Sequence, residues 1–282
     1  MIRLIGIDVD GTLLDTEGRL PDANREAIHA AVAAGIHVSL VTGRSYPFAR
    51  PVADTLPPSV TLMVSSGAVE RTMDGSTLAR RLLNRDVARL VLESTRHVRE
   101  HTAVIFDRDR ERQIIFESMD WTHPNRQGYW DRNHWLIDRT APLEDSLVED
   151  PIQVMFNGHP AEMRALSDLL RASGRCDGGQ PRYSVSLTEY LPRDFSLVDI
   201  TAPDATKGRA LLWRAGQLGL TRDQVMAVGD NFNDLDMLEA AGVAVVMANA
   251  DPALHRPGWH LTGHQNDAGL AEAIERFALR SV

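Results

Sequence analysis

Hydrophobic residues in the first part of the chain alternate between short continuous runs and a helical spacing. Strand-like runs lie at residues 2–7, 36–43 and 60–67, and each is short, rich in β-branched or aliphatic residues and bounded by polar or glycine positions. Between the first two runs, the segment 21–35 places its apolar residues on one helix face and ends at Gly35. Strands that alternate with helices predict a parallel sheet with helices on its faces.

The pattern changes between about residue 81 and residue 200. Two helical stretches near 85–101 and 160–173 stand among short strand-like runs. These runs are residues 103–107, 112–117, 152–157, 183–189 and 195–200. The alternating pattern then resumes, so we expect an α+β domain at residues 83–200 to be inserted into an α/β domain built from residues 1–82 and 201–282.

Composition narrows the class of protein. The 282 residues are 43% hydrophobic with a net charge of −9, which argues against disorder and, without a basic block, against a nucleic-acid partner. The one cysteine, Cys176, has no second cysteine to pair with, so a reducing compartment suits the chain. No secretory pattern and no apolar run of about 18 residues is present. We therefore expect a cytoplasmic protein that does not enter a membrane.

Polar residues follow the apolar runs of the first domain. Asp8 and Asp10 follow the first run, Thr42 the second, and Ser65 and Ser66 the third. The carboxyl ends of parallel strands share one sheet edge, where ligands of such sheets bind. Asp8 and Asp10, two residues apart, should project from the same side at about 6–7 Å from each other. Two carboxylates so close need a cation or a shared proton to offset their repulsion. The alternative interpretation is that these residues only form a polar turn at the end of the strand.

The second half of the chain supplies further polar groups. Lys207 stands at the start of a predicted helix, where a cation is favourable only beside an anion; a solvated, frayed lysine is the alternative. Asp230, Asn233, Asp234 and Asp236 crowd after another apolar run. A helix cap needs one such residue, so the excess indicates a hard cation with oxygen ligands. Together with the first-half residues, they predict a magnesium site beside a phosphate cradle, with a carboxylate free to attack.

Four motifs in order then give a resemblance. DVDGTLL from Asp8, VTGR from Val41, ATKG around Lys207 and GDNFNDLDM from Gly229 resemble the haloacid-dehalogenase superfamily of phosphohydrolases, most closely its Cof-type branch (class IIB). Ser66 departs from the asparagine that this branch usually has. The resemblance implies an α/β fold with a Rossmann-like parallel-sheet core and an inserted α+β cap domain that governs substrate choice.

The resemblance also implies a Mg²⁺-dependent phosphomonoester hydrolase acting on sugar phosphates or similar small metabolites. Asp8 would be the nucleophile that forms an aspartyl-phosphate, and Asp10, kept protonated by its acidic surroundings, the general acid and base. Mg²⁺ would bind the carboxylates of Asp8 and Asp230 and the backbone carbonyl of Asp10. Asp234 would orient Lys207 or a metal-bound water. The groups implied for the phosphoryl oxygens are Thr42, Lys207, Asn233 and the backbone amides of Val9 and Gly43.

Other functions remain open at this point. A phosphotransferase or phosphomutase would use the same residues with another acceptor. HVREH at residues 97–101 matches the H-x-x-E-H pattern of zinc proteases, although its histidines fit a semi-buried helix of the inserted domain. A non-catalytic binding module would be expected to lose Asp8, Asp10 or Asp230, and all three are present. The sequence predicts no oligomeric state.

One stretch of the inserted domain is unusual in composition. Residues 119–135 hold three of the five tryptophans and read as a loop. Such a loop either recognises sugar rings or bases by stacking, or folds back on the core of its own domain.

Overall fold

The computed structural model describes residues 1–108, 111–174, 181–190 and 193–280, so Cys176 lies outside the described residues. The chain divides into two compact units. We call Met1–Arg80 with Ala205–Val282 the core unit and Arg81–Asp204 the cap unit. The sequence pattern placed these divisions at residues 83 and 200.

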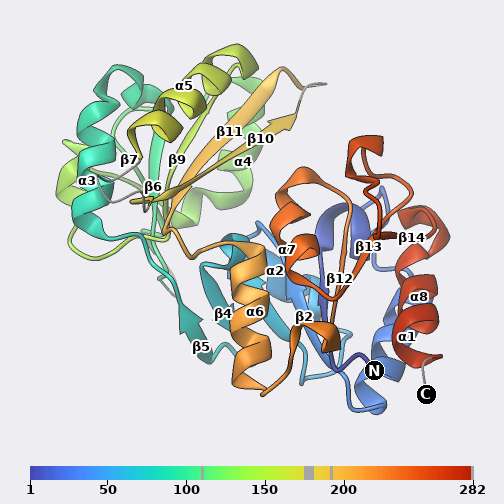
Figure 1. The fold of residues 1–282 in the computed structure, drawn as a ribbon. Helices are drawn as coiled ribbons and strands as arrows, with labels where there is room; N and C mark the ends of the chain where they lie inside the picture. The colour runs from blue at the N-terminus through green and yellow to red at the C-terminus, as the bar shows by residue number, and fades with distance from the viewer. Residues whose placement is uncertain (109–110, 175–180, 191–192, 281–282) are drawn as a thin grey trace. The chain divides into compact units, whose positions relative to one another are not determined.

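The core unit contains an eight-stranded sheet with the order β14-β13-β12-β1-β2-β3-β4-β5 (Figure 1). The strands are β1 (Leu4–Ile7), β2 (His37–Val41), β3 (Thr61–Val64), β4 (Val69–Arg71), β5 (Thr77–Arg80), β12 (Val225–Gly229), β13 (Val243–Val246) and β14 (His260–Leu261). From β14 to β3 neighbouring strands are parallel, which confirms the predicted α/β class. The antiparallel strands β4 and β5 were not predicted from the sequence. The chain reverses direction in the short turn directly after β3, so β4 pairs antiparallel with β3.

Helices cover both faces of this sheet. They are α1 (Asp22–Ala33), α2 (Tyr46–Ala49), α6 (Lys207–Gln217), α7 (Leu235–Ala240) and α8 (Gly269–Ile274). Figure 1 shows α6 on one side of the sheet and α1 with α8 on the other. A Cβ on Gly6 of β1 would lie 2.8 Å from the Leu211 side chain, so the absence of a side chain lets α6 approach the strand that leads to Asp8. Among the described residues, no helix combines the length and the apolar character that a membrane span requires.

The cap unit has a six-stranded sheet with the order β10-β11-β9-β6-β7-β8. The strands are β6 (Thr102–Ile105), β7 (Ile114–Phe116), β8 (Ile137–Arg139), β9 (Gln153–Gly158), β10 (Ser184–Tyr190) and β11 (Phe195–Thr201), and α3 (Arg85–Ser94) and α5 (Pro160–Ser173) pack on it. The predicted helix 85–101 is too long: α3 ends at Ser94 and a 3₁₀ turn follows at Arg96–His101. The Thr95 hydroxyl donates to the Val91 carbonyl at 2.7 Å, and the Thr95 backbone leaves helical geometry.

Residues 119–135 are not the loop that the sequence suggested, since α4 spans Pro124–Asn133. His123 caps this helix and Pro124 starts it, but the segment lacks an apolar face and contains Gly128, which hid the helix from the pattern. Trp121 packs edge-on against Phe116 with ring centroids 5.1 Å apart, so part of the segment does fold back on its own domain. Trp135, in contrast, is 52% exposed.

Candidate active site

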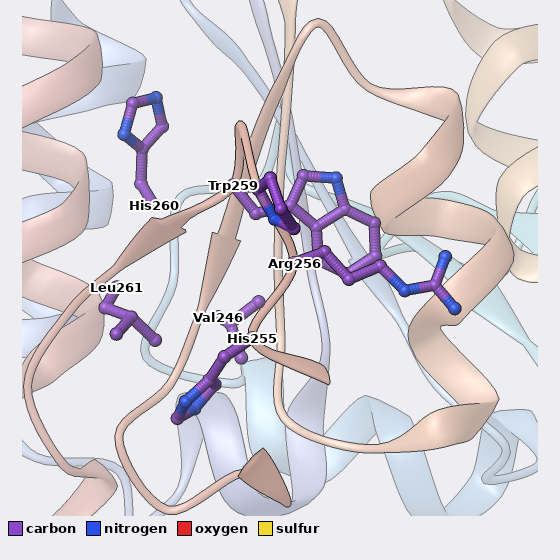
Figure 2. A pocket seen from close by; sticks show the side chains of 7 residues that line it. Val246, His255, Arg256, Trp259, His260 and Leu261 are labelled. Carbon is purple, nitrogen blue, oxygen red and sulfur yellow. The ribbon is translucent and has the colours of Figure 1, made fainter. Parts of the chain in front are cut away.

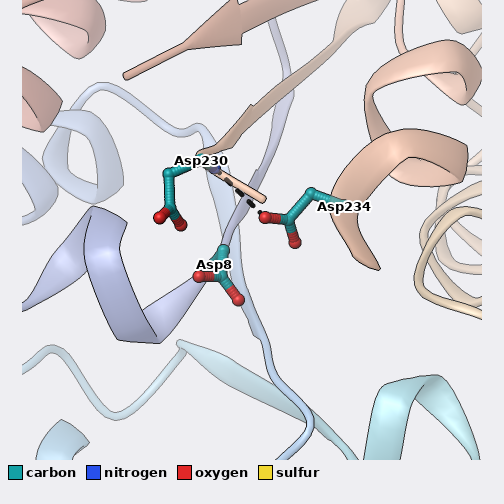
Figure 3. A group of neighbouring side chains, drawn as sticks. All are labelled: Asp8, Asp230 and Asp234. Carbon is teal, nitrogen blue, oxygen red and sulfur yellow. Dashed lines mark hydrogen bonds between the residues drawn. The ribbon is translucent and has the colours of Figure 1, made fainter. Parts of the chain in front are cut away.

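Two acidic residues lie side by side at the carboxyl ends of neighbouring strands. Asp8 directly follows β1 and Asp230 directly follows β12, and the two strands are paired in parallel from Leu4 to Ile7. Asp234 comes from the turn after Asp230. Carboxylate oxygens of the three residues lie within 4.8 Å of one another (Figure 3). We call these three side chains the carboxylate cluster. The sequence separates Asp8 from the other two members by more than 200 residues, and the strand order brings them together.

Lys207 joins two members of the cluster. Its Nζ lies 2.6 Å from Asp8 Oδ1 and 2.7 Å from Asp234 Oδ1, and its side chain is 1% exposed. The hydroxyl of Thr206 caps α6 by accepting the Arg209 N–H, so Lys207 is the first residue of a fixed helix. The alternative prediction, that Lys207 is solvated and frayed, is therefore wrong. The anions beside this helix start are carboxylates of the protein itself.

Asp234 is fully buried and both of its oxygens are engaged. Oδ1 accepts from Lys207, and Oδ2 accepts the backbone N–H groups of Asp230 and Asn231, each at 3.1 Å. Asp236 has a different role, since its Oδ2 accepts the Gly208 N–H at 2.9 Å and so joins α7 to the start of α6. Of the acids crowded in GDNFNDLDM, Asp230 and Asp234 thus belong to the cluster, whereas Asp236 positions the helix that carries Lys207.

Burial and like charge raise the pKa values of the cluster. Burial raises the pKa of Asp8 well above its usual value, the negative charge of Asp234 adds to this, and Lys207 opposes it. Burial, followed by the charge of Asp234, raises the pKa of Asp230 to about 7. For Lys207, burial lowers the pKa, but the charges of Asp234 and Asp8 outweigh it and the net pKa lies above the ordinary value. One buried cation therefore does not fully compensate three carboxylates.

A divalent cation fits this donor set. Among the described residues, Oδ2 of Asp8 accepts no hydrogen bond, and the Asp230 carboxylate receives only longer bonds, 3.2 Å from Thr12 and 3.4 Å from Asn249. Hard cations take carboxylate oxygens and would relieve the repulsion that raises these pKa values. Asp8 and Asp230 have free coordination capacity, whereas Asp234 is already bound by Lys207 and two amides. The cluster can hold a metal ion, with Asp8 and Asp230 as its most available ligands.

Asp10 does not project beside Asp8 as the strand pattern predicted. β1 ends at Ile7, and residues Val9–Leu13 form a wide turn instead of continuing the strand, with the Leu13 N–H donating to the Asp8 carbonyl and the Leu14 N–H to the Val9 carbonyl. The Asp10 carboxylate instead accepts two hydrogen bonds from the guanidinium of Arg44. The direct partner of the Asp10 carboxylate in this structure is therefore a cation.

The remaining predicted residues lie near the strand ends, with different surroundings. Thr42 is buried after β2, and its Oγ1 accepts the Arg44 N–H at 3.1 Å. Gly43 is exposed beside it, and Val9 is buried after Asp8. Asn233 is exposed on the turn between Asp230 and α7, where its side chain has no hydrogen-bond partner among the described residues.

Several contacts around the cluster were not predicted as site features. Asn249 Nδ2 donates to the Gly11 carbonyl at 2.9 Å and lies 3.4 Å from Asp230 Oδ2, so one amide links the loop after β1 to Asp230. Gly11 has φ 93°, and a Cβ there would lie 2.2 Å from Asp230 Oδ2. Three sequence features could have indicated these contacts: Gly11-Thr12 after Asp10, Arg44 at the end of VTGR, and Asn249 in VVMANA.

The zinc-protease pattern does not form a metal site in the described part of the chain. His97 is exposed, while His101 Nδ1 lies 2.8 Å from Arg126 Nη2 and 2.9 Å from the Asn157 carbonyl. Because this segment is a 3₁₀ turn, the two histidines lack the spacing of an α-helical ligand pair. Within the described residues, the carboxylate cluster is the group of His, Cys, Asp and Glu side chains suited to a metal ion.

A cavity of about 220 Å³ lies elsewhere in the core unit. Figure 2 shows its lining side chains, among them His255, Trp259 and His260, and Arg256 extends over the Trp259 ring at 5.2 Å. The lining contains no acidic residue and none of the predicted site residues. The cavity is therefore not the place where the cluster would bind a substrate.

The chain is similar to known proteins over almost its whole length. The family model described as haloacid dehalogenase-like hydrolase matches residues 5–274. The 5-amino-6-(5-phospho-D-ribitylamino)uracil phosphatase YcsE of Bacillus subtilis is 26% identical over 99% of this chain and 96% of its own. The phosphoglycolate phosphatase of Methanothermobacter thermautotrophicus is 25% identical over 98% and 99%. The solved structure of the HAD subclass IIB sugar phosphatase BT4131 covers 98% of this chain, and this chain covers 99% of it, with a TM-score of 0.72 and 18% identity, which is a likeness of fold.

Proposed function

The chain belongs to the haloacid dehalogenase-like hydrolase family, and on that premise we propose that it is a Mg²⁺-dependent phosphomonoester hydrolase that works through an aspartyl-phosphate. The observation that carries the proposal is the buried Asp8, which Lys207 holds by one oxygen while the other oxygen accepts no hydrogen bond from the described residues. A carboxylate oriented by one oxygen and unbound at the other is suited to nucleophilic attack.

In the proposed reaction, the free oxygen of Asp8 attacks phosphorus, and the bond from phosphorus to the ester oxygen breaks. Asp10 gives a proton to the departing alkoxide. Asp10 then takes a proton from the water that attacks the aspartyl-phosphate, which releases inorganic phosphate and restores the Asp8 carboxylate. In this structure, Arg44 orients the Asp10 carboxyl group through two hydrogen bonds.

The remaining residues of the proposed site would bind Mg²⁺ and the phosphoryl oxygens. Asp230, the backbone carbonyl of Asp10 and the Asp8 oxygen that does not attack phosphorus would hold Mg²⁺, which when bound would offset the negative charge of the phosphoryl group. Asp234 positions Lys207 through their 2.7 Å contact. The proposed ligands of the phosphoryl oxygens are Thr42, Lys207, Asn233 and the backbone amides of Val9 and Gly43, which stabilise the transition state as charge develops.

The proposed substrates are sugar phosphates or similar small phosphorylated metabolites of the cytoplasm. Support comes from the phosphatases among the relatives and from the sugar phosphatase BT4131, whose fold is alike. The cap unit is the proposed specificity domain, and its exposed Trp135 and Trp130 offer ring faces of the kind that stack on sugars.

Phosphate release from a broad panel of phosphomonoesters, measured with Mg²⁺ and with EDTA, tests the proposal. We expect turnover that needs Mg²⁺ and that Asp8→Asn abolishes while the variant stays folded by circular dichroism. Acid quenching with ³²P-labelled substrate should trap label on the wild type alone. Turnover by folded Asp8→Asn would exclude the covalent route. Adding glycerol or glucose as acceptor separates a hydrolase from a phosphotransferase, because a transferase would convert the acceptor instead of releasing phosphate.

A further inference from the structure

The turn after β3 adopts a backbone conformation that side chains rarely adopt. Three consecutive residues have positive φ: Ser65 at 50°, Ser66 at 57° and Gly67 at 90°. Only glycine enters this region without strain, and two of the three residues are serines. Such strain persists where the surroundings enforce it, and it gathers at functional sites.

The surroundings here are two segments of the candidate site. The Ser65 N–H donates to the Arg44 carbonyl at 2.8 Å, and the Ser66 N–H donates to the Thr42 carbonyl at 2.9 Å. On the other side, a Cβ on Gly67 would lie 2.5 Å from the Thr206 carbonyl oxygen, so the turn packs against the start of α6. The turn is thus held between the end of β2 and the residue that precedes Lys207.

The hydroxyl of Ser66 lies close to Gly43, one of the residues proposed to bind the phosphoryl group. A Cβ on Gly43 would lie 3.7 Å from Ser66 Oγ, which places the hydroxyl beside the exposed backbone of Gly43. Ser66 is itself partly exposed, and its Oγ has no hydrogen-bond partner among the described residues. A strained residue therefore supports a hydroxyl that bonds to no described group.

We infer that Ser66 Oγ is a ligand of the phosphoryl group and donates a hydrogen bond to one of its oxygens. The inference rests on the proposed function. It assigns the hydroxyl to the phosphoryl group rather than to the leaving group because both flanking segments, residues 42–43 and 206–207, supply groups proposed for phosphoryl oxygens. A hydroxyl beside the Gly43 amide adds a donor to that set.

Titration calorimetry of inorganic phosphate with Mg²⁺, together with thermal unfolding, tests this role without requiring turnover. Ser66→Ala and Ser66→Gly should each weaken phosphate binding about ten-fold, since one hydrogen bond to a charged group is lost. Ser66→Gly should also raise the unfolding temperature by about 2 °C, because glycine relieves the strain. A merely structural role would not combine weaker binding with greater stability.

Ala268→Gly is the matched control, because Ala268 also has positive φ (54°) and has no part in the proposed site. It should gain stability similarly and keep the affinity for phosphate. Unchanged phosphate affinity in both Ser66 variants, or a wild type that does not bind phosphate, overturns the inference. If phosphate binding follows the expected pattern but the wild type hydrolyses no phosphomonoester, the proposed function fails and Ser66 stands as an anion ligand.

Discussion

The guanidinium of Arg44 binds both carboxylate oxygens of Asp10, with Nε donating to Oδ2 at 2.9 Å and Nη2 to Oδ1 at 2.5 Å. The hydrogen bond to Asp10 raises the pKa of Arg44 above its ordinary value, although burial opposes this. Two parallel bonds fix the orientation of a carboxylate as well as its distance. Arg44 therefore determines where Asp10 points in this structure.

Arg44→Gln should affect turnover more than stability. The Asp10 side chain is 61% exposed, and exposed ion pairs contribute about 0–1 kcal/mol, so the unfolding temperature should change little. Without its orienting partner, Asp10 should protonate the leaving group less well, and kcat for a sugar phosphate should fall about ten-fold. Steady-state kinetics in the wild-type and Asp10→Asn backgrounds check this. If Arg44→Gln lowers kcat by the same factor in both, Arg44 does not act through Asp10.

Asp10→Asn should separate good leaving groups from poor ones. A sugar alkoxide needs a proton to depart, so the rate of sugar phosphate hydrolysis should fall about 10²–10⁴-fold. Nitrophenolate departs readily without a proton, so nitrophenol release should fall far less. Hydrolysis of the aspartyl-phosphate also needs Asp10 as base, so the variant should accumulate this intermediate from nitrophenyl phosphate. Rapid-quench kinetics should show a burst of nitrophenol followed by slow turnover. Equal losses on both substrates without a burst would instead give Asp10 a structural role.

Gly11→Ala should weaken metal binding. The new Cβ would lie 2.2 Å from Asp230 Oδ2, and φ of 93° strains any side chain, so the Asp230 carboxylate must move. We expect the Mg²⁺ concentration for half-maximal activity to rise about ten-fold or more, and the protein to lose about 1–3 kcal/mol of stability.

Gly216→Ala serves as the control for Gly11→Ala. Gly216 lies in α6 with no atom within 4 Å of an added Cβ, so alanine should leave the Mg²⁺ requirement unchanged and stabilise the helix by up to about 1 kcal/mol. A Gly11→Ala enzyme with the wild-type Mg²⁺ requirement would show that Asp230 does not need its present position.

Asp199 in the cap unit should make stability depend on pH. Burial raises its pKa to about 7, and its Oδ1 accepts a hydrogen bond from Gln153 at 2.9 Å. The native state therefore holds a proton up to about pH 7 that the unfolded chain releases near pH 4, so this group's contribution to the free energy of unfolding falls as pH rises between those values. Asp199→Asn should remove that dependence.

Urea unfolding at pH 4, 5.5 and 8, followed by tryptophan fluorescence, measures the effect. Trp121, Trp130 and Trp135 lie in the cap unit and report on it. Relative to the wild type, Asp199→Asn should be more stable at pH 8 by about 2 kcal/mol and nearly equal at pH 4. A stability difference that stays constant over the three pH values would mean that Asp199 does not hold a proton in the native state.

Much of this molecule follows from local sequence. Apolar runs such as Leu4–Ile7 are short and bounded by polar or glycine residues, which is typical of strands buried on both faces of a parallel sheet. Parallel strands in turn bring their carboxyl ends to one edge, so Asp8, Thr42 and Asp230 could be assigned to a common site before any contact was known. The helix start at Lys207 and the family itself were likewise predicted from motifs, and the family match confirms the latter.

The partners of each side chain were decided only by the tertiary structure. Asp8 and Asp10 have the same chemistry and lie two residues apart, yet one is buried against Lys207 and the other is bound to Arg44 near the surface. The difference arises because the chain leaves the extended conformation after Asp8, so the alternation of strand side chains no longer applies to Asp10. The periodicity of a strand predicts direction only while the strand lasts, and its end depends on contacts with segments more than 200 residues away, such as Asn249 on the Gly11 carbonyl.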